Sequence, residues 1–341
     1  MKIRKKVLLT GASGTVGFEV LKQLHTQKER FDITVFDVKS VKSKKKFHPY
    51  KKDITIIYGS ICNENDINKI GTHQDIVIHL AAIIPPLADD MPELSHQVNA
   101  VGTQKLIAFL EKTSPTAFFI YSSSISVYGD RLNTPFINVN DNINPSIGDE
   151  YAKTKIEAEK TIKSSRLDWT IFRLAAIMGG HKVSKLMFHQ PLKTSLEIAT
   201  PEDTARAFIN AIDKQEQLSK KTFNLGGGES CRMVYENFLA HSFNIYGLGE
   251  LNFPLKSFAE KNFHCGYYED GDVLNNLLDF RNDSIESYFE KEKQKLSPFK
   301  VKIISIFKNP IKSYLKKQSE PLIAYTTKDK ELMQQFFESE N

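Results

Sequence analysis

The stretch KKVLLTGASGTVG occupies residues 5–17, where an apolar run passes directly into Gly11, Gly14 and Gly17. A segment with a helical pattern follows at 15–28. Side chains at such glycines would obstruct a tight turn, the approach of a pyrophosphate or the packing of a helix on a strand. Backbone N–H groups at the start of the helix would then face the phosphates. The pattern predicts a strand, a phosphate-binding loop and a helix, and therefore a bound dinucleotide.

Apolar runs alternate with helical patterns through the first half of the chain. We expect strands at 5–10, 32–37, 53–58, 75–80, 116–121, 168–174 and 221–225, and helices at 15–28, 64–70, 93–112 and 149–165. Strands that alternate with helices imply crossover units and a parallel sheet, and near-continuous apolar strands fit a sheet covered on both faces. The expected fold is α/β, a Rossmann-like doubly wound parallel sheet with a smaller C-terminal lobe.

The alternation weakens after about residue 177. We expect residues 1–176 plus 221–228 to form the nucleotide-binding domain. Residues 177–220 plus 229–341 are expected to form a substrate lobe that ends in a basic helical tail.

In that tail the segment 299–317 combines lysines with an apolar helical face. The face contains Ile303, Ile304, Phe307, Ile311 and Leu315. Pro310 is expected to kink this helix or split it in two. Two interpretations stay open, namely docking of the face on the body of the protein and binding to an anionic membrane surface.

Composition narrows the class of protein. The chain has 341 residues, 40% of them hydrophobic and 26% charged, with a net charge of +5. The three cysteines, Cys62, Cys231 and Cys265, have no metal-ligand spacing, and an odd, sparse count suits a reduced cytoplasmic protein. Since no run of 18 apolar residues occurs, no transmembrane span is expected.

Seven lysines between residues 39 and 52 are interpreted as a solvated loop rather than a nucleic-acid contact.

Asp37 ends the second expected strand, twenty residues after Gly17. A carboxylate there accepts hydrogen bonds from the ribose hydroxyls of NAD and repels the 2′-phosphate of NADP. The sequence therefore predicts NAD rather than NADP, although one of the following lysines could reach a 2′-phosphate.

Further motifs follow in a fixed order: HLAA at 79–82, VNAVGT at 98–103, YSSSISVYG at 121–129, YAKTK at 151–155 and FRLAAIMG at 172–179. Together with the glycine loop and Asp37 they resemble the extended short-chain dehydrogenase/reductase family, in its NAD-dependent epimerase/dehydratase group. The resemblance covers roughly residues 5–228. It implies a homodimer in which the helices 93–112 and 149–165 pair across a two-fold axis.

The resemblance also implies the site residues. Ser124, Tyr151 and Lys155 match the catalytic positions of the family. The positions that match its cofactor site are Gly11, Ser13, Gly14, Thr15, Val16, Gly17, Asp37, Ser60, Ile61, Leu80, Ala81, Ala82, Asn99 and Ser122, together with Tyr151 and Lys155. One of them departs from the pattern, because family members often have Asp where this chain has Ser60.

The chemistry that these residues support is proton transfer beside a nicotinamide ring. A tyrosine phenol titrates near pH 10. Lys155 lies four residues after Tyr151, on the same face of a helix. Its ammonium, together with the positive nicotinamide ring, is expected to favour the phenolate and lower the pKa of the phenol. Tyr151 would then exchange a proton with a substrate hydroxyl, while Ser124 would hydrogen-bond the reacting oxygen.

The substrate is a small molecule whose class the sequence narrows only in part. Ala176 and Met178 stand where sugar-nucleotide enzymes of the family carry Asn and Tyr, and the loop at 83–87 is apolar. Both features favour a secondary alcohol or ketone. An NAD-dependent sugar-nucleotide epimerase and a non-catalytic NAD-binding regulatory protein remain as alternatives. Dehydration is disfavoured, since no carboxylate follows Ser124 at 125–128.

Overall fold

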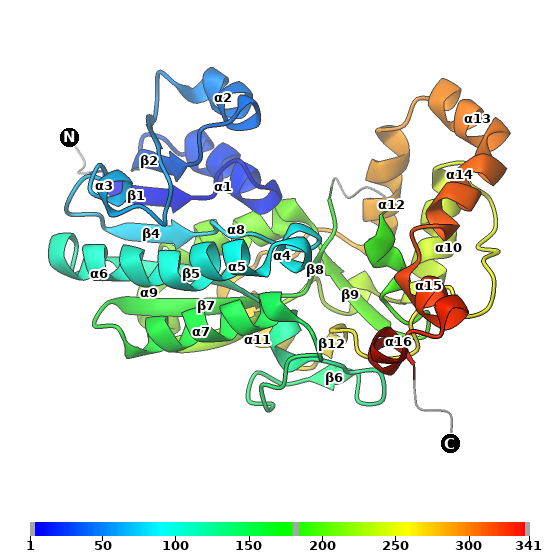
Figure 1. The fold of residues 1–341 in the computed structure, drawn as a ribbon. Coiled ribbons are helices and arrows are strands. Elements are labelled where there is room, and N and C mark those ends of the chain that lie inside the picture. The colour runs from blue at the N-terminus through cyan, green and yellow to red at the C-terminus, as the bar shows by residue number, and fades with distance from the viewer. Residues whose placement is uncertain (1–3, 180–183, 338–341) are drawn as a thin grey trace.

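A computed structural model describes residues 4–179 and 184–337. Its centre is a parallel sheet of seven strands in the order β3-β2-β1-β4-β5-β7-β10 (Figure 1). The strands are β1 (Lys5–Thr10), β2 (Phe31–Asp37), β3 (Thr55–Tyr58), β4 (Ile76–His79), β5 (Phe118–Ser124), β7 (Asp168–Leu174) and β10 (Lys221–Leu225). The strand order reverses between β1 and β4, and a doubly wound sheet binds its ligand at the carboxyl ends of the strands at such a point.

All seven expected strands are present, which confirms the predicted Rossmann-like fold. The largest difference is in β5, which was expected at 116–121 and runs from Phe118 to Ser124. All three serines of the serine run therefore belong to the strand. Ser122, Ser123 and Ser124 pair with Phe172, Arg173 and Leu174 of β7.

Helices cover both faces of the sheet because both faces of its strands are apolar. Val7 and Leu9 of β1 face α1 (Thr15–Thr26), α8 (Pro201–Ala211) and α11 (Gly271–Leu278). Leu8 faces the opposite side, where α3 (Glu64–Ile67), α6 (Thr103–Thr113) and α7 (Glu150–Ser164) pack. The sheet thus takes α8 and α11 from segments that we assigned to the lobe. The domain boundaries stay a prediction.

The helix expected at 93–112 is interrupted. After α4 (Leu87–Asp90), the helix α5 (Pro92–His96) passes into a π-helical stretch, Gln97–Gly102, before α6 begins. Short π-helical stretches in helices are rare and occur frequently at functional sites. Asn99, one of the expected site residues, lies in this one.

The lysine-rich segment forms a helix, so the expectation of a loop was wrong. The helix α2 (Val41–Phe47) begins at Ser40, whose hydroxyl accepts a hydrogen bond from the N–H of Ser43, while Ser43 caps Ser40 in return. This reciprocal cap satisfies N–H groups that the first turn would leave unpaired. Phe47 is buried in the core, and a single 3₁₀ turn, His48–Tyr50, follows.

The C-terminal lobe surrounds a small sheet of β8 (Ala176–Ile177), β9 (Ser195–Ala199) and β11 (Arg232–Val234). Its helices are α10 (Tyr235–Ile245), α12 (Ile285–Gln294), α15 (Glu320–Thr327) and α16 (Lys330–Phe336). The short strands β6 (Phe136–Ile137) and β12 (Tyr267–Tyr268) pair with each other, and α9 (Gln215–Leu218) precedes β10.

The basic tail forms two helices, α13 (Pro298–Ile306) and α14 (Lys308–Lys316), which break at Phe307 rather than at Pro310. Pro310 lies in the first turn of α14, where a missing N–H costs no hydrogen bond. The expected apolar face is divided. Ile304, Ile311 and Leu315 pack against the core of the lobe, whereas Ile303 and Phe307 are exposed. Across residues 4–179 and 184–337, no helix has the length and apolar character to cross a bilayer.

Candidate active site

A cavity of about 910 Å³ opens at the carboxyl ends of the central strands. Its walls come from the glycine loop, the ends of β4, β5 and β7, the start of α7 and four separate segments of the lobe. Of the expected site residues, those that line it are Gly11, Gly14, Thr15, Val16, Gly17, Leu80, Ala82, Ser122, Ser124 and Tyr151. The cavity therefore joins the glycine loop to the serine run and to the tyrosine.

The glycine loop leaves no room for side chains. Gly11 has a φ of +71°, and a Cβ placed there would lie 2.6 Å from the N atom of Ala81. A Cβ at Gly17 would lie 2.2 Å from the carbonyl oxygen of Gly11. The loop closes on itself through a hydrogen bond of 3.0 Å from Gly14 N to Gly11 O. These close approaches account for the glycine spacing and leave the start of α1 open to the cavity.

Asp37 lies beside this loop rather than on the cavity wall. Its carboxylate accepts hydrogen bonds from Ser13 N at 2.7 Å and from Ser13 Oγ at 3.1 Å, and burial raises the pKa of Asp37. Lys46 of α2 donates to the carbonyl oxygens of Ser13 and Gly14 and lies over the ring of Phe18. The lysine-rich helix thus supplies one lysine to the phosphate-binding loop.

Ser60 and Ile61 follow β3 outside the cavity lining. Ser60 N donates to the carboxylate of Asp66 at 3.0 Å, and Ser60 Oγ accepts from Cys62 N. Ile61 is buried against Gly102. Ser60 stands where family members often carry an aspartate. The carboxylate of Asp66, on α3, lies at the same turn instead.

Ala81 and Asn99 support the cavity from behind. Ala81 N donates to Thr10 Oγ1. The Asn99 amide exchanges two hydrogen bonds with the backbone of Ile83 and donates to Thr154 Oγ1 of α7 at 3.0 Å. Asn99 therefore ties the loop after β4 to the helix that carries Tyr151.

Tyr151, Ser124 and Lys155 come together at the end of β5. Tyr151 and Ser124 line the cavity and share a hydrogen bond. Lys155 is buried one turn along α7; its Nζ donates to Ser122 O at 2.8 Å and lies 5.7 Å from the centre of the Tyr151 ring. The three residues that the family resemblance marked as catalytic form one cluster.

The pKa values in this cluster correct one expectation. Burial raises the pKa of Tyr151 and outweighs the hydrogen bond from Ser124, which lowers it. Burial also lowers the pKa of Lys155 to about 7. Lys155 does not lower the tyrosine pKa as expected, because a site that has lost water disfavours both charged forms. Any lowering of the Tyr151 pKa has to come from positive charge bound in the cavity.

Two buried polar groups hold the ends of these strands. Glu159 of α7 lies 2.8 Å from Arg173 of β7 and accepts from Ser123 Oγ at 2.6 Å. Arg173 outweighs burial and lowers the pKa of Glu159 to about 2. His79 lies between Thr10 and Thr103, and burial lowers its pKa to about 3, so it remains neutral.

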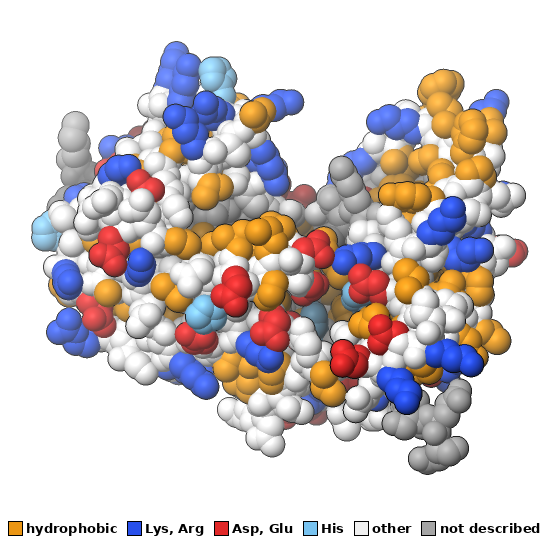
Figure 2. Space-filling view, viewed as in Figure 1, with side chains coloured by type: hydrophobic (Ala, Val, Ile, Leu, Met, Phe, Trp, Pro, Cys, Tyr) orange, Lys and Arg blue, Asp and Glu red, His pale blue; other side chains and the backbone are white. Residues whose placement is uncertain are grey.

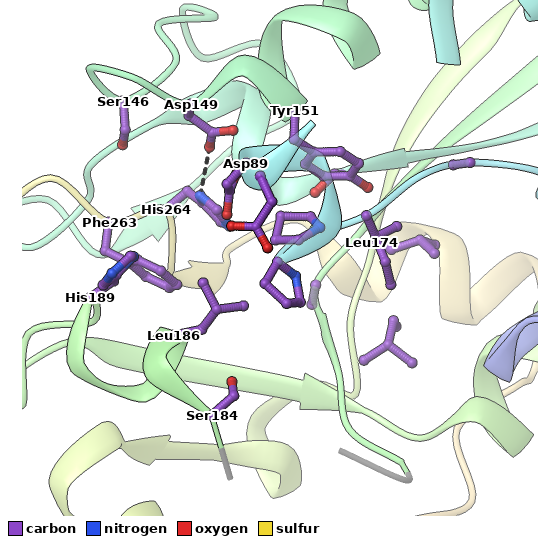
Figure 3. A pocket seen from close by; sticks show the side chains of 18 of the residues that line it. Asp89, Ser146, Asp149, Tyr151, Leu174, Ser184, Leu186, His189, Phe263 and His264 are labelled. Atoms are coloured by element: carbon purple, nitrogen blue, oxygen red, sulfur yellow. Dashed lines mark ion pairs between the residues drawn. The ribbon is translucent and has the colours of Figure 1, made fainter. Parts of the chain in front are cut away.

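The far end of the cavity carries polar groups that the sequence did not indicate. His264 Nδ1 lies 2.8 Å from the Asp149 carboxylate at the start of α7, and Asp89 lies near both (Figure 3). Burial raises the pKa of Asp89. His189 pairs with Glu320 at 2.8 Å. Asp149 and His264 are 115 residues apart in the chain, so no local spacing could have identified them.

None of these groups forms a metal centre within the described ranges 4–179 and 184–337. His181 lies outside those ranges. The three cysteines are free thiols. The polar end of the cavity therefore offers carboxylates and imidazoles as hydrogen-bonding or proton-transfer groups.

Residues 8–171 match the 3-beta hydroxysteroid dehydrogenase/isomerase family. The chain is 26% identical over 129 residues to D-erythronate dehydrogenase of Haemophilus influenzae, which covers 37% of this chain and 40% of that protein. It is 31% identical over 189 residues to UDP-glucose 4-epimerase of Vibrio cholerae, which covers 52% of this chain and 53% of that one. The matches thus span about half, or less, of the length of these two relatives.

Among solved structures, UDP-glucuronic acid 4-epimerase of Bacillus cereus, in complex with UDP-glucuronic acid and NAD, superposes with a TM-score of 0.69. The match covers 88% of this chain and 99% of that one at 17% identity, so it shows a shared fold. Together with the strand order, the glycine loop and the Ser-Tyr-Lys cluster, these matches are consistent with the extended short-chain dehydrogenase/reductase family.

Proposed function

We propose that the protein is an NAD-dependent oxidoreductase that transfers hydride at a secondary alcohol or ketone, with Tyr151 as acid/base. One observation carries the proposal. The glycine loop, Ser124 and Tyr151 line a single cavity, with Lys155 buried behind the tyrosine. A dinucleotide held by the loop at one end would therefore reach the proton-transfer group at the other.

The loop fits a dinucleotide, since Gly11, Gly14 and Gly17 line the cavity and carry no side chain that would block the approach of a pyrophosphate. Backbone N–H groups at the start of α1 would hold the pyrophosphate, and Asp37 would accept from the ribose hydroxyls. NAD supplies hydride transfer when bound. Among the residues that the structure describes, Lys46 is the cation near Asp37 that contacts the loop backbone. NAD is preferred over NADP because Asp37 lies buried beside Ser13.

The chain's own residues would perform the proton transfer. Ser124 would hydrogen-bond the substrate oxygen, whose charge changes during the reaction. Tyr151 would take the hydroxyl proton in oxidation or return it in reduction. Lys155, about half protonated near pH 7, would hold the nicotinamide ribose and favour the phenolate when charged.

The walls of the cavity support a substrate that is apolar on one side. Ile84, Pro85 and Pro86 from the loop after β4 line it, as do Ala175 and Ile177. Beyond Ser124 and Tyr151, charged groups gather at the far end, where Asp149, His264 and Asp89 lie. An alcohol or ketone with an apolar body and a distant polar group would match both surfaces.

An epimerase acting on a sugar nucleotide is the second candidate. Its support is the similarity to UDP-glucose 4-epimerase of Vibrio cholerae. Against it, Ala176 and Met178 replace the usual Asn and Tyr. Dehydration stays disfavoured on the same ground as before, the lack of a carboxylate after Ser124, although Asp89 and Asp149 bring carboxylates to the cavity from other segments.

We also propose a cytoplasmic homodimer in which α6 and α7 pair with their copies across a two-fold axis. The support is the family arrangement and the position of both helices on one face of the sheet (Figure 1). Size-exclusion chromatography with light scattering would measure the mass.

The test is Tyr151→Phe. Purified protein is screened with NAD against secondary alcohols, and the rate of NADH formation is measured. The variant is expected to lose about 100- to 10,000-fold in kcat, the usual contribution of a positioned acid/base, while its Kd for NAD stays within about twofold. Loss of the hydroxyl removes the proton carrier without opening the glycine loop.

Tyr50→Phe is the matched control, because Tyr50 lies outside the cavity lining and should keep full activity. Full activity in Tyr151→Phe would rule out the acid/base role. NAD binding without turnover of any substrate by the unaltered protein would instead favour the regulatory alternative.

A further inference from the structure

The segment 293–317, which joins the end of α12 to α13 and α14, exposes large apolar side chains. Phe299 is 73% exposed, Ile306 68%, Tyr314 64% and Phe307 55%. No residue of α13 is buried. Soluble proteins rarely leave apolar groups clustered in water, and such clusters mark interaction surfaces.

The same segment carries charge of a single sign. It has no Asp or Glu, and its eight lysines are Lys293, Lys295, Lys300, Lys302, Lys308, Lys312, Lys316 and Lys317. Figure 2 shows hydrophobic and basic side chains together at the α13 end of the molecule. The occupant of this surface must therefore be apolar in its interior and negatively charged at its boundary.

This charge pattern disfavours a second copy of the chain, because two such segments would bring sixteen lysines together and neither segment contains an acidic residue. It also disfavours nucleic acid. Aliphatic side chains such as Ile303 and Ile306 provide no stacking platform for bases, and the segment contains no arginine.

We propose that the 293–317 segment docks the protein on the surface of an anionic phospholipid bilayer. Phe299, Ile306 and Phe307 would enter the boundary between headgroups and acyl chains. The lysines would keep their ammonium groups among the lipid phosphates, since long side chains can bury their stems and leave the charge in water. The proposal does not depend on the reaction that the cavity performs.

A second basic surface lies at the same end of the molecule. The helix α2 exposes Val41 together with Lys42, Lys44 and Lys45. Figure 1 shows α2 and α13 projecting to the top of the view, and the space-filling view of Figure 2 shows a notch between these two projections. A smaller cavity of about 250 Å³ lies between the two sides of this notch, and its lining contains the lysines Lys46, Lys291 and Lys295 as well as the glutamates Glu19, Glu202 and Glu292. One flat surface could therefore meet both helices.

The experiment is flotation of the full-length protein with lipid vesicles. Vesicles of phosphatidylcholine with about a third phosphatidylserine are compared with vesicles of phosphatidylcholine alone. Binding is expected only to the anionic vesicles. It should weaken as salt is raised, because the Debye length falls from about 10 Å at 0.1 M to about 3 Å at 1 M.

Two variants separate the apolar and electrostatic parts. Ile306→Ser/Phe307→Ser and Lys302→Gln/Lys308→Gln change exposed side chains, so folding should be kept. Each is expected to lower the partition coefficient at least tenfold, at about fivefold per lysine near an anionic surface.

Matched controls change equally exposed groups elsewhere. Val273→Ser on α11 replaces an apolar side chain that is 53% exposed, and Lys112→Gln/Lys160→Gln removes two exposed lysines from α6 and α7. Both controls should float like the unaltered protein. Thermal unfolding and the Kd for NAD should be unchanged in all four proteins.

Three outcomes would overturn the proposal. They are equal flotation with neutral and anionic vesicles, unaltered flotation of both segment variants, and no flotation at all. If the protein binds polyglutamate but no vesicle, the surface recognises an acidic protein instead of a bilayer.

Discussion

The buried ammonium of Lys155 lowers the stability of the folded protein. Its pKa falls from 10.5 to about 7 because burial disfavours the charged form. Below pH 7 Lys155 is protonated in the folded protein, and the desolvation of its buried charge lowers the free energy of unfolding by its full amount. As pH rises from about 7 to 10.5 the unfolded chain holds the proton more tightly than the folded one, so the free energy of unfolding rises from this group.

Lys155→Met is therefore expected to stabilise the fold while it abolishes turnover. At pH 6 the free energy of unfolding should rise by about 2–3 kcal/mol, less than the full pKa shift at ~1.4 kcal/mol per unit, because the hydrogen bond to Ser122 O is lost. The gain should shrink as pH approaches 10. Urea unfolding followed by circular dichroism across this pH range measures it, and a variant less stable than the unaltered protein at pH 6 would contradict the argument.

The Glu159–Arg173 pair changes stability with pH in the opposite way, because its contribution is lost at low pH. Both side chains are nearly fully buried, and the pKa of Glu159 falls from 4.5 to about 2. The pair therefore stabilises the fold above pH 4.5, and this contribution is lost as pH falls through about 2. Glu159→Gln should cost about 3–5 kcal/mol at pH 7, because it leaves the Arg173 charge buried without a partner.

Glu150→Gln is the control on the same helix. Glu150 pairs with Lys153, and both side chains are about half exposed, so its loss should cost less than about 1 kcal/mol. Chemical unfolding at pH 7 compares the two variants. Equal costs would mean that the buried pair contributes no more than the exposed one.

At the scale of the elements, the glycine loop depends on a close backbone contact at Gly17 that leaves no space for a side chain. A Cβ at Gly17 would lie 2.2 Å from Gly11 O and 2.9 Å from Ala12 Cα. Gly17→Ala is thus expected to destabilise the fold by about 1–3 kcal/mol, the usual cost of overpacking, and to weaken NAD binding at least tenfold. Calorimetry of NAD binding and thermal unfolding measure both effects.

Gly71→Ala is the matched control, since a Cβ there would meet only the amide of Gln74 at 3.7 Å. It should leave NAD affinity unchanged. Unchanged affinity in Gly17→Ala would show that the loop can shift, and the steric account of its spacing would be wrong.

Elements built from local pattern were predictable, and those that depend on caps or on distant packing were not. The strand 168–174 was predicted to the residue because Trp169, Ile171 and Phe172 give it a local apolar pattern. The helix α2 was missed, since four of its seven residues are lysines and the pattern does not show the cap between Ser40 and Ser43. The break between α13 and α14 falls at Phe307, although Pro310 is the only local breaker nearby.

At the scale of the whole molecule, one end of the cavity was predictable from local sequence patterns and the other end was not. The cofactor end could be read from motifs that lie within single loops or strands, such as Gly11 to Gly17. The other end is assembled from segments around 89, 149, 189, 264 and 320, which meet only when the lobe closes over α7. A local sequence pattern does not indicate which distant segments lie side by side, so only the structure identifies the His264–Asp149 pair.

Ligand-dependent stability tests the cavity as one unit. At about a hundred times its Kd, a ligand that binds only the folded state adds roughly 2.7 kcal/mol to the free energy of unfolding. The midpoint temperature of thermal unfolding should therefore rise with saturating NAD. It should rise less with NADP, because the 2′-phosphate would approach the carboxylate of Asp37. An equal or larger shift with NADP would mean that Lys46, beside the loop at Ser13, outweighs that carboxylate.

The same measurement, repeated with NAD plus UDP-, GDP- or dTDP-sugars, decides between the two candidate reactions. The far end of the cavity presents Asp89 and Asp149, whose negative charges would oppose a second diphosphate, and Ala176 offers no side-chain amide. No further stabilisation is therefore expected from any sugar nucleotide, whereas a secondary alcohol that is turned over should add to the effect of NAD. A further rise with one sugar nucleotide would show that the lobe binds the diphosphate through other groups, and the epimerase would become the leading candidate.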